Sequence, residues 1–93
     1  IGIGYWDAAV CATTPEAVAQ AIMHAVAVAG VDHVGLGSDY DGATTVGWDT
    51  ANLAVVTDAL LKAGLGETDI AKVMGGNAQR LLAAGLAPAA AAR

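Results

Sequence analysis

The chain has 93 residues, of which 56% are hydrophobic and 14% are charged, and its net charge is −5 with four Lys and Arg residues in all. So few basic residues argue against nucleic acid or an anionic membrane as a partner, because both bind clustered Lys and Arg. The single cysteine excludes an internal disulfide.

The balance of apolar and charged residues predicts a chain that belongs to something larger. Ordinary globular chains are roughly 45–50% apolar and about 25% charged, so this chain has little polar surface for its size. We expect it to associate with copies of itself or to be one part of a bigger fold. No apolar run reaches the roughly 18 residues of a membrane span, and no signal-peptide pattern opens the chain. The first residues already resemble a strand, so we expect an N-terminal part to precede them.

Residues 1–6 predict a first strand, because β-branched or aromatic residues alternate with glycine. The pattern Gly-x-Gly-x-Trp at residues 2–6 recurs as Gly-x-Gly-x-Asp at residues 35–39. The separation between the two copies is about the length of one βα unit. In a parallel sheet, Trp6 and Asp39 would then stand at equivalent heights at the C-terminal edge. Trp6 keeps two interpretations, a residue of a site and a core aromatic.

An amphipathic helix is predicted over residues 13–30. Pro15 suits its first turn, and Thr13 with Glu16 has the spacing of a capping box. Gly30 should end it. Its core stripe comprises Val18, Ile22, Ala25, Val26 and Ala29. Strand, helix and strand together predict one right-handed βαβ unit.

Residues 33–42 form an apolar run that ends in two carboxylates, which predicts a buried parallel strand. Side chains alternate along a strand, so Asp39 should share a face with Gly35 and Gly37. The C-terminal tip of a parallel strand is where α/β folds place their chemistry. On these grounds alone, Asp39 is equally well a catalytic group or a loop-capping aspartate.

A loop and a further helix should follow this strand. The loop spans residues 43–49, contains Trp48 and is long enough to form part of a site. The helix should end near Gly64. Its candidate caps are Asp49, Thr50 and Asn52, and its core stripe is Leu53, Val56, Leu60 and Leu61.

The last part of the chain predicts two short helices and a tail. Residues 67–74 begin with acids, which the helix dipole favours in a first turn. After a break at two glycines, Asn77 should cap a helix over residues 78–84. We interpret Arg80 as a surface charge or a charge near the helix C-terminus. Residues 87–93 form an Ala-rich tail that we expect to fray.

Three motifs give only weak support for a ligand site. The Gly-x-Gly at residues 35–37 lacks the third glycine of a dinucleotide fingerprint, since Tyr40 stands there. Residues 39–42 resemble the opening of a calcium loop but lack a third ligand position and a closing Glu. His24 and His33 have no carboxylate or cysteine at ligand spacing, so we interpret both as structural.

Four segments, in order and with matching gaps, resemble the membrane (renal) dipeptidase family. Residues 32–42, Asp-His-Val-Gly-Leu-Gly-Ser-Asp-Tyr-Asp-Gly, resemble its final strand, and residues 1–11 resemble the strand before it. Residues 60–74 resemble its helix with an acidic start. Gly-Gly-Asn at residues 75–77, followed by Arg-Leu at residues 80–81, resembles its closing helix. The resemblance covers nearly the full length.

This resemblance implies an α/β fold, the C-terminal portion of a metal-dependent (β/α)8 barrel of the amidohydrolase type that cleaves dipeptides at a two-zinc centre. In the family the metal ligands come from earlier strands, as a His-x-Asp pair, a bridging Glu and two further His, so this chain would supply none. Asp39 matches the catalytic Asp, which takes a proton from the metal-bridging hydroxide, and Trp6 and Tyr40 would bind the substrate. Residues 1–86 would form the last two βα units with the closing helices, inactive in isolation.

Two other hypotheses stay open at this point. One is a self-contained, flavodoxin-like α/β module that binds a phosphate or nucleotide at its loop edge, which would need a third and a fourth strand. The other is an interaction piece that docks on a separate, barrel-completing chain through its exposed apolar surface.

Overall fold

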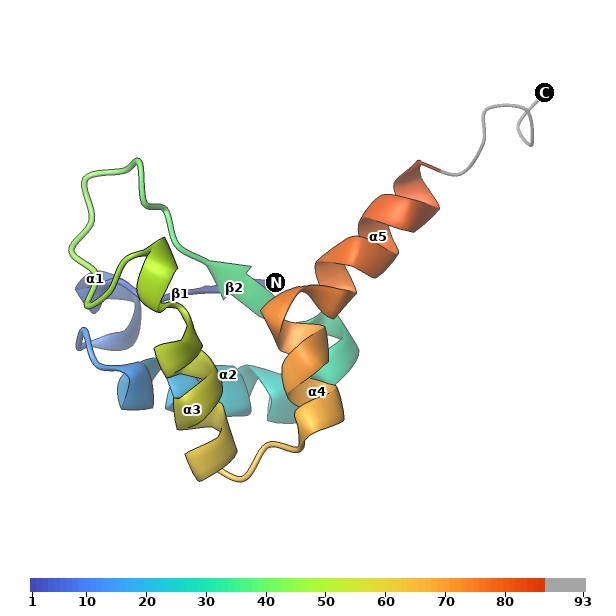
Figure 1. Cartoon of the computed structure of the whole chain (residues 1–93), viewed down its shortest axis with the longest axis horizontal. Helices are drawn as coiled ribbons and strands as arrows, with labels where there is room; N and C mark the ends of the chain where they lie inside the picture. Colours follow the sequence, from blue (N-terminus) through green and yellow to red (C-terminus); the bar gives the residue numbers. More distant parts are fainter. Residues whose placement is uncertain (87–93) are drawn as a thin grey trace.

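The computed structural model describes residues 1–86 as two short strands surrounded by helices, a mixed α/β arrangement (Figure 1). In chain order the elements are β1 (Gly2–Gly4), α1 (Asp7–Val10), α2 (Pro15–Ala29), η1 (Val31–His33), β2 (Gly35–Gly37), η2 (Thr50–Asn52), α3 (Ala54–Lys62), α4 (Glu67–Ala71), η3 (Lys72–Gly76) and α5 (Asn77–Gly85). The predicted fraying of residues 87–93 lies outside the described part of the chain.

The two strands pair in parallel, as the repeated glycine pattern predicts. Their register joins Gly2 to Gly35, Ile3 to Leu36 and Gly4 to Gly37, which is the alignment of the two copies of the pattern. Helix α2 connects the strands, so β1, α2 and β2 form the expected βαβ unit. Within residues 1–86 the sheet holds these two strands, whereas a flavodoxin-like module would need more.

Strand β2 is much shorter than the predicted run of residues 33–42. A 3-10 turn occupies Val31–His33 at its start, and the strand ends at Gly37. Beyond that point Asp39 takes a left-handed backbone conformation with φ 53°, so the chain turns away from the sheet. Strand alternation therefore does not extend to Asp39, and the prediction that Asp39 shares a strand face with Gly35 and Gly37 was wrong.

Helix α2 begins one residue later than the capping-box spacing suggests. Thr14, in an extended conformation, accepts a hydrogen bond from the Ala17 amide at 3.2 Å, so Thr14 and not Thr13 is the N-cap. The helix ends before Gly30 as predicted. Val18 and Ile22 are fully buried, but the predicted core residue Ala29 is exposed, together with Ala27 and Val28 in the same last turn.

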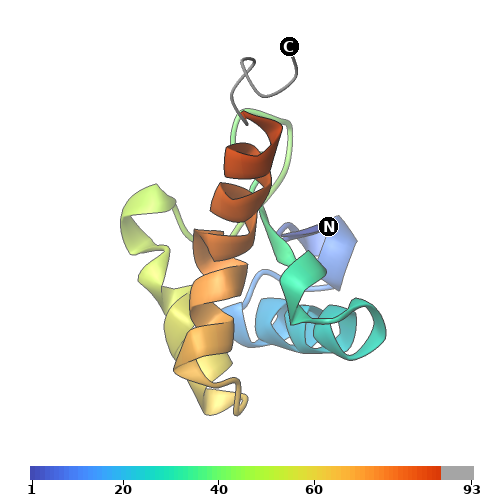
Figure 2. The same ribbon diagram turned by 90° about the vertical axis from the view of Figure 1, so that its right-hand side faces the viewer.

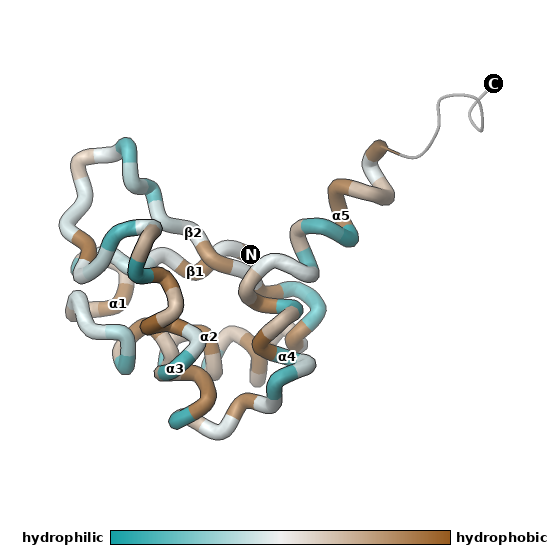
Figure 3. Tube along the Cα trace, in the orientation of Figure 1, coloured by the Kyte–Doolittle hydropathy of each residue, from teal (hydrophilic) through white to brown (hydrophobic). Residues whose placement is uncertain are grey.

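The core lies between α2, α3, α4 and the strands, and Figure 3 shows hydrophobic stretches gathered where these helices meet. Asp49 caps the turn η2 ahead of α3, accepting a hydrogen bond from the Asn52 amide at 3.1 Å. Leu61, predicted in the core stripe, is 48% exposed, because it lies on the outer side of α3. The buried apolar residues are Tyr5, Val18, Ala19, Ile22, Val34, Trp48, Val56, Ala59, Leu60, Leu65, Ile70 and Val73.

The closing helices are joined without a gap. Helix α4 ends at Ala71 and not at residue 74, because the chain passes into the π-helical segment η3, where Gly75 has non-helical angles (φ 160°, ψ −19°). Asn77 then has helical angles and begins α5 itself, so the prediction that it caps this helix from outside was wrong. Helix α5 projects away from the rest of the chain (Figures 1 and 2).

Candidate functional site

Asp39 lies in a tight turn immediately after β2. Its carbonyl accepts a hydrogen bond from the Gly42 amide at 2.9 Å, which closes the turn, and another from the Thr44 hydroxyl at 3.2 Å. Its carboxylate curls over Gly42 so closely that a Cβ on Gly42 would stand 2.8 Å from it. Asp39 itself is exposed to solvent.

The way this turn is held bears on the two interpretations of Asp39. The Asp39 carbonyl accepts the hydrogen bonds of the turn, whereas no donor among the described residues forms a hydrogen bond with its carboxylate. A loop-capping aspartate would use its side-chain oxygens for this task. The geometry therefore leaves the carboxylate open for a ligand or a water molecule.

Tyr5, at the end of β1, supports this turn from below. Its ring meets the edge of the Tyr40 ring at a centroid distance of 5.8 Å and an interplanar angle of 74°. Burial, followed by the hydrogen bond with Tyr40, raises the pKa of Tyr5 to about 12. Tyr5 thus stays neutral and packs against Tyr40, the residue that follows Asp39.

Trp48 completes an aromatic stack beneath the turn. Its ring stacks on Tyr5 at a centroid distance of 5.1 Å and an interplanar angle of 17°. The Trp48 side chain is buried, and its Nε1 has no hydrogen-bond partner within residues 1–86. The loop after β2 is therefore anchored to the strand ends through Tyr5.

Trp6 occupies the same end of the sheet but makes different contacts. Its backbone forms an antiparallel bridge with Val46, and the neighbouring Asp7 amide donates to the Thr45 carbonyl at 3.3 Å. The half-buried indole covers Gly4, where an added Cβ would overlap its six-membered ring. Within the described residues, no hydrogen bond or ring contact joins the side chains of Trp6 and Tyr40.

The predicted site residues thus share the C-terminal end of the strands, and two of their supports were missed from the sequence. Tyr5 was not singled out, and Trp48 was noted only as part of a loop. A signal for Tyr5 was present, because the alignment of the two glycine patterns places it beside Ser38, the residue before Asp39. The stacking of Trp48 on Tyr5 joins residues that are far apart in the sequence and has no local pattern.

The described residues contain no metal centre of their own. No group of three or more His, Cys, Asp or Glu side chains within residues 1–86 is arranged to hold an ion. His24 and His33 are both exposed. A cavity of about 450 Å³ lies between the strands, η1, η3 and α5, and Asp39 is not among its lining residues.

The helices of residues 1–86 are also too short or too polar to cross a membrane.

Comparison with known proteins places most of the chain in one family. The model of the membrane dipeptidases, peptidase family M19, matches residues 9–91. The match includes Asp39 and Tyr40, whereas Tyr5 and Trp6 precede it. No solved structure matches the chain. The chain therefore belongs to the membrane dipeptidase family, peptidase family M19.

Proposed function

We propose that the chain forms the last two βα units and the closing helices of a (β/α)8 barrel that hydrolyses dipeptides. The membrane dipeptidases are a family of zinc-dependent peptidases. The described residues do not fit a complete zinc site, so the zinc ligands would lie on other strands of the barrel. The contribution of this chain is then the general acid/base and part of the substrate pocket.

The observation that carries this proposal is the position of the Asp39 carboxylate. It follows a parallel strand at its C-terminal end, which is where barrel enzymes gather their catalytic groups. It is exposed, and the hydrogen bonds of its turn are made by its main chain. Asp39 can therefore accept a proton from the attacking water and return it to the departing amine.

The sheet supports the same proposal. Gly35 and Gly37 bring no side chains to the space around β2, which would leave room in the centre of a barrel. Trp6 and Tyr40, both partly accessible at the strand ends, would contact the substrate beside Asp39. Residues 1–86 would constitute this portion, with residues 87–93 as its tail.

The proposal is tested by comparing the 93-residue chain with the complete polypeptide from which it would come. We expect the complete polypeptide to bind zinc stoichiometrically and to hydrolyse dipeptides, and the shorter chain to do neither. The upstream sequence should carry a His-x-Asp near its first strand. A tight stoichiometric zinc titration of the shorter chain, or dipeptide hydrolysis by it, would contradict the proposal.

A further inference from the structure

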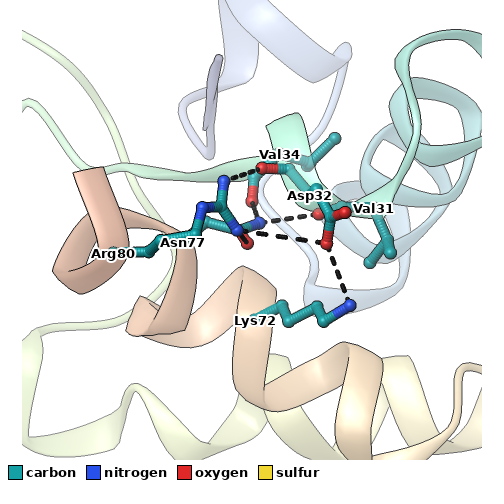
Figure 4. Close-up of polar contacts among 6 residues, drawn as sticks. All are labelled: Val31, Asp32, Val34, Lys72, Asn77 and Arg80. Atoms are coloured by element: carbon teal, nitrogen blue, oxygen red, sulfur yellow. Dashed lines mark hydrogen bonds and ion pairs between the residues drawn. The ribbon is translucent and has the colours of Figure 1, made fainter. Parts of the chain in front are cut away.

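Asn77 is a buried polar residue that reaches across to the chain entering β2 (Figure 4). The exposed fraction of Asn77 is only 4%. Its Nδ2 donates two hydrogen bonds, to the Val31 carbonyl at 2.6 Å and to the Val34 carbonyl at 2.8 Å. Both protons of the amide group are thereby used on main-chain acceptors.

Arg80 binds the oxygen of the Asn77 side-chain amide. One guanidinium nitrogen donates to Asn77 Oδ1 at 2.8 Å, and the other donates to the Asp32 carbonyl at 2.6 Å. Lys72 pairs with the Asp32 carboxylate at 2.9 Å and lowers the pKa of that carboxyl. Asn77 and Arg80, called the clamp below, therefore join α5 to η1 and to the residue that follows it, and Lys72 joins η3 to the same turn.

Together these contacts satisfy every main-chain carbonyl from residue 31 to residue 34. The clamp donates hydrogen bonds to the carbonyls of Val31, Asp32 and Val34. The main-chain nitrogen of Ile1 donates to the remaining carbonyl, that of His33, at 2.6 Å. Side-chain donors from α5 thus serve most of this segment. The backbone that enters β2 has its position set by α5 and not by the sheet alone.

The sheet has little means of its own to fix this position. Two of the three residue pairs in its register are glycine opposite glycine, and only Ile3 and Leu36 bring side chains. Glycine-rich strands specify their register weakly, because no packed side chain resists a slip. The clamp supplies the constraint that side-chain packing does not.

We infer that Asn77, oriented by Arg80, is a positioning residue that fixes the entry of β2 and thereby the place of Asp39, which follows the other end of this short strand. This inference rests on the catalytic role proposed above for Asp39. The exit of β2 is held independently, by the packing of Tyr5 against the Tyr40 and Trp48 rings. Loosening the entry should shift Asp39 without removing any group that touches a substrate.

The test replaces the two members of the clamp separately. Asn77→Asp keeps the shape of the side chain and removes both donors, whereas Arg80→Gln leaves those donors and frees the amide oxygen. Gln79→Glu is the matched control, because it makes the same amide-to-acid change at an exposed position of α5. Each variant is studied both as the chain described here and within the complete dipeptidase.

The first measurement is amide hydrogen exchange in the isolated chain, which needs no activity. We expect Asn77→Asp to speed exchange of the β1 and β2 amides roughly tenfold or more, with α2 unchanged relative to the control. Arg80→Gln should act at the same place with a smaller effect, and it decides the matter if Asn77→Asp does not fold. Unchanged exchange, or an equal increase in every element, would overturn the inference.

The second measurement is steady-state kinetics in the complete enzyme, with kcat expressed per zinc-loaded molecule. We expect Asn77→Asp to lower kcat about tenfold or more while KM and zinc content stay near those of Gln79→Glu. A kcat equal to that of the control would overturn the positioning role and leave the proposed function intact. If Asp39→Asn itself leaves kcat unchanged, the proposed function fails, and the exchange experiment still decides whether the clamp fixes β2.

Discussion

The carboxylate of Asp39 rests directly against Gly42: a Cβ built on Gly42 would lie 2.8 Å from the carboxylate carbon and from both of its oxygens. Gly42→Ala must therefore displace the carboxylate, even though the substitution adds only a methyl group. A displacement of about 1 Å at a catalytic group can cost roughly 10²-fold in rate. We expect kcat of the complete enzyme to fall by up to that factor, with zinc content unchanged.

Gly66→Ala provides the control for this substitution, because nothing lies within 4 Å of a Cβ at Gly66. We expect that variant to keep full activity. If Gly42→Ala has the same kcat as Gly66→Ala, the position of the Asp39 carboxylate does not matter to the reaction.

Replacing Asp39 itself separates its chemistry from its role in folding. Asp39→Asn keeps the volume but cannot accept a proton, and loss of a general acid or base costs roughly 10²–10⁴ in rate. Because the hydrogen bonds of the turn are made by the Asp39 carbonyl, the melting temperature should be retained. Zinc content should be retained as well, since Asp39 is proposed as a proton acceptor.

Asp41→Asn is the comparison, since Asp41 is an exposed carboxylate of the same turn. We expect it to leave turnover nearly normal. Equal losses in the two variants, or loss of zinc in Asp39→Asn, would make Asp39 a structural residue or a metal ligand.

The features that could be predicted from the sequence are those set by local pattern. The recurrence of Gly-x-Gly at residues 2–4 and 35–37 predicted the parallel register, because the same pattern in two strands aligns them. The ends of α2 followed from Pro15 and Gly30, whose backbone preferences are intrinsic. The family followed from motifs distributed over the whole chain.

The features that could not be predicted depend on contacts between distant residues. Asparagine is a residue type that often caps helices, yet the side-chain amide of Asn77 donates hydrogen bonds to the carbonyls of Val31 and Val34, far earlier in the chain. Arg80 is exposed, as a surface charge should be, but its hydrogen bonds to Asn77 and to the Asp32 carbonyl had no signal in the sequence. The orientation of Asp39 was extrapolated from strand alternation, which stops where the turn begins.

Tyr5 gives a prediction on pH and stability. Its pKa is raised from 10.0 to about 12, so the folded chain holds the phenol proton longer than the unfolded chain does. The stabilisation from the neutral phenol is therefore complete below pH 10 and is lost as the pH rises from 10 to 12. At pH 8 we expect Tyr5→Phe to be less stable by about 1 kcal/mol, from loss of the hydroxyl's hydrogen bonds.

This difference between the native chain and Tyr5→Phe should shrink above pH 10, because only the native chain has the phenol to ionise. Denaturant titrations at pH 8 and at pH 11 measure it. The lysines Lys62 and Lys72, whose pKa values are raised by their Asp58 and Asp32 partners, titrate in both proteins and cancel in the comparison. A stability difference that is the same at both pH values would contradict the assignment of the raised pKa to Tyr5.

Two exposed leucines at the end of α5 give the last prediction, which concerns association. Leu82, on α5, and Leu86, the residue that directly follows this helix, are four positions apart and are 61% and 71% exposed. Burying a leucine side chain contributes about 1.5–3 kcal/mol, so this stripe favours self-association of the isolated chain. Sedimentation at micromolar concentration should show dimers or larger species.

Replacing both leucines with lysine should weaken association by roughly tenfold or more. Val28→Lys, at a 75% exposed position on α2, should leave it unchanged. A native chain that is a monodisperse monomer, or equal effects of the α5 and α2 substitutions, would show that this stripe does not drive association.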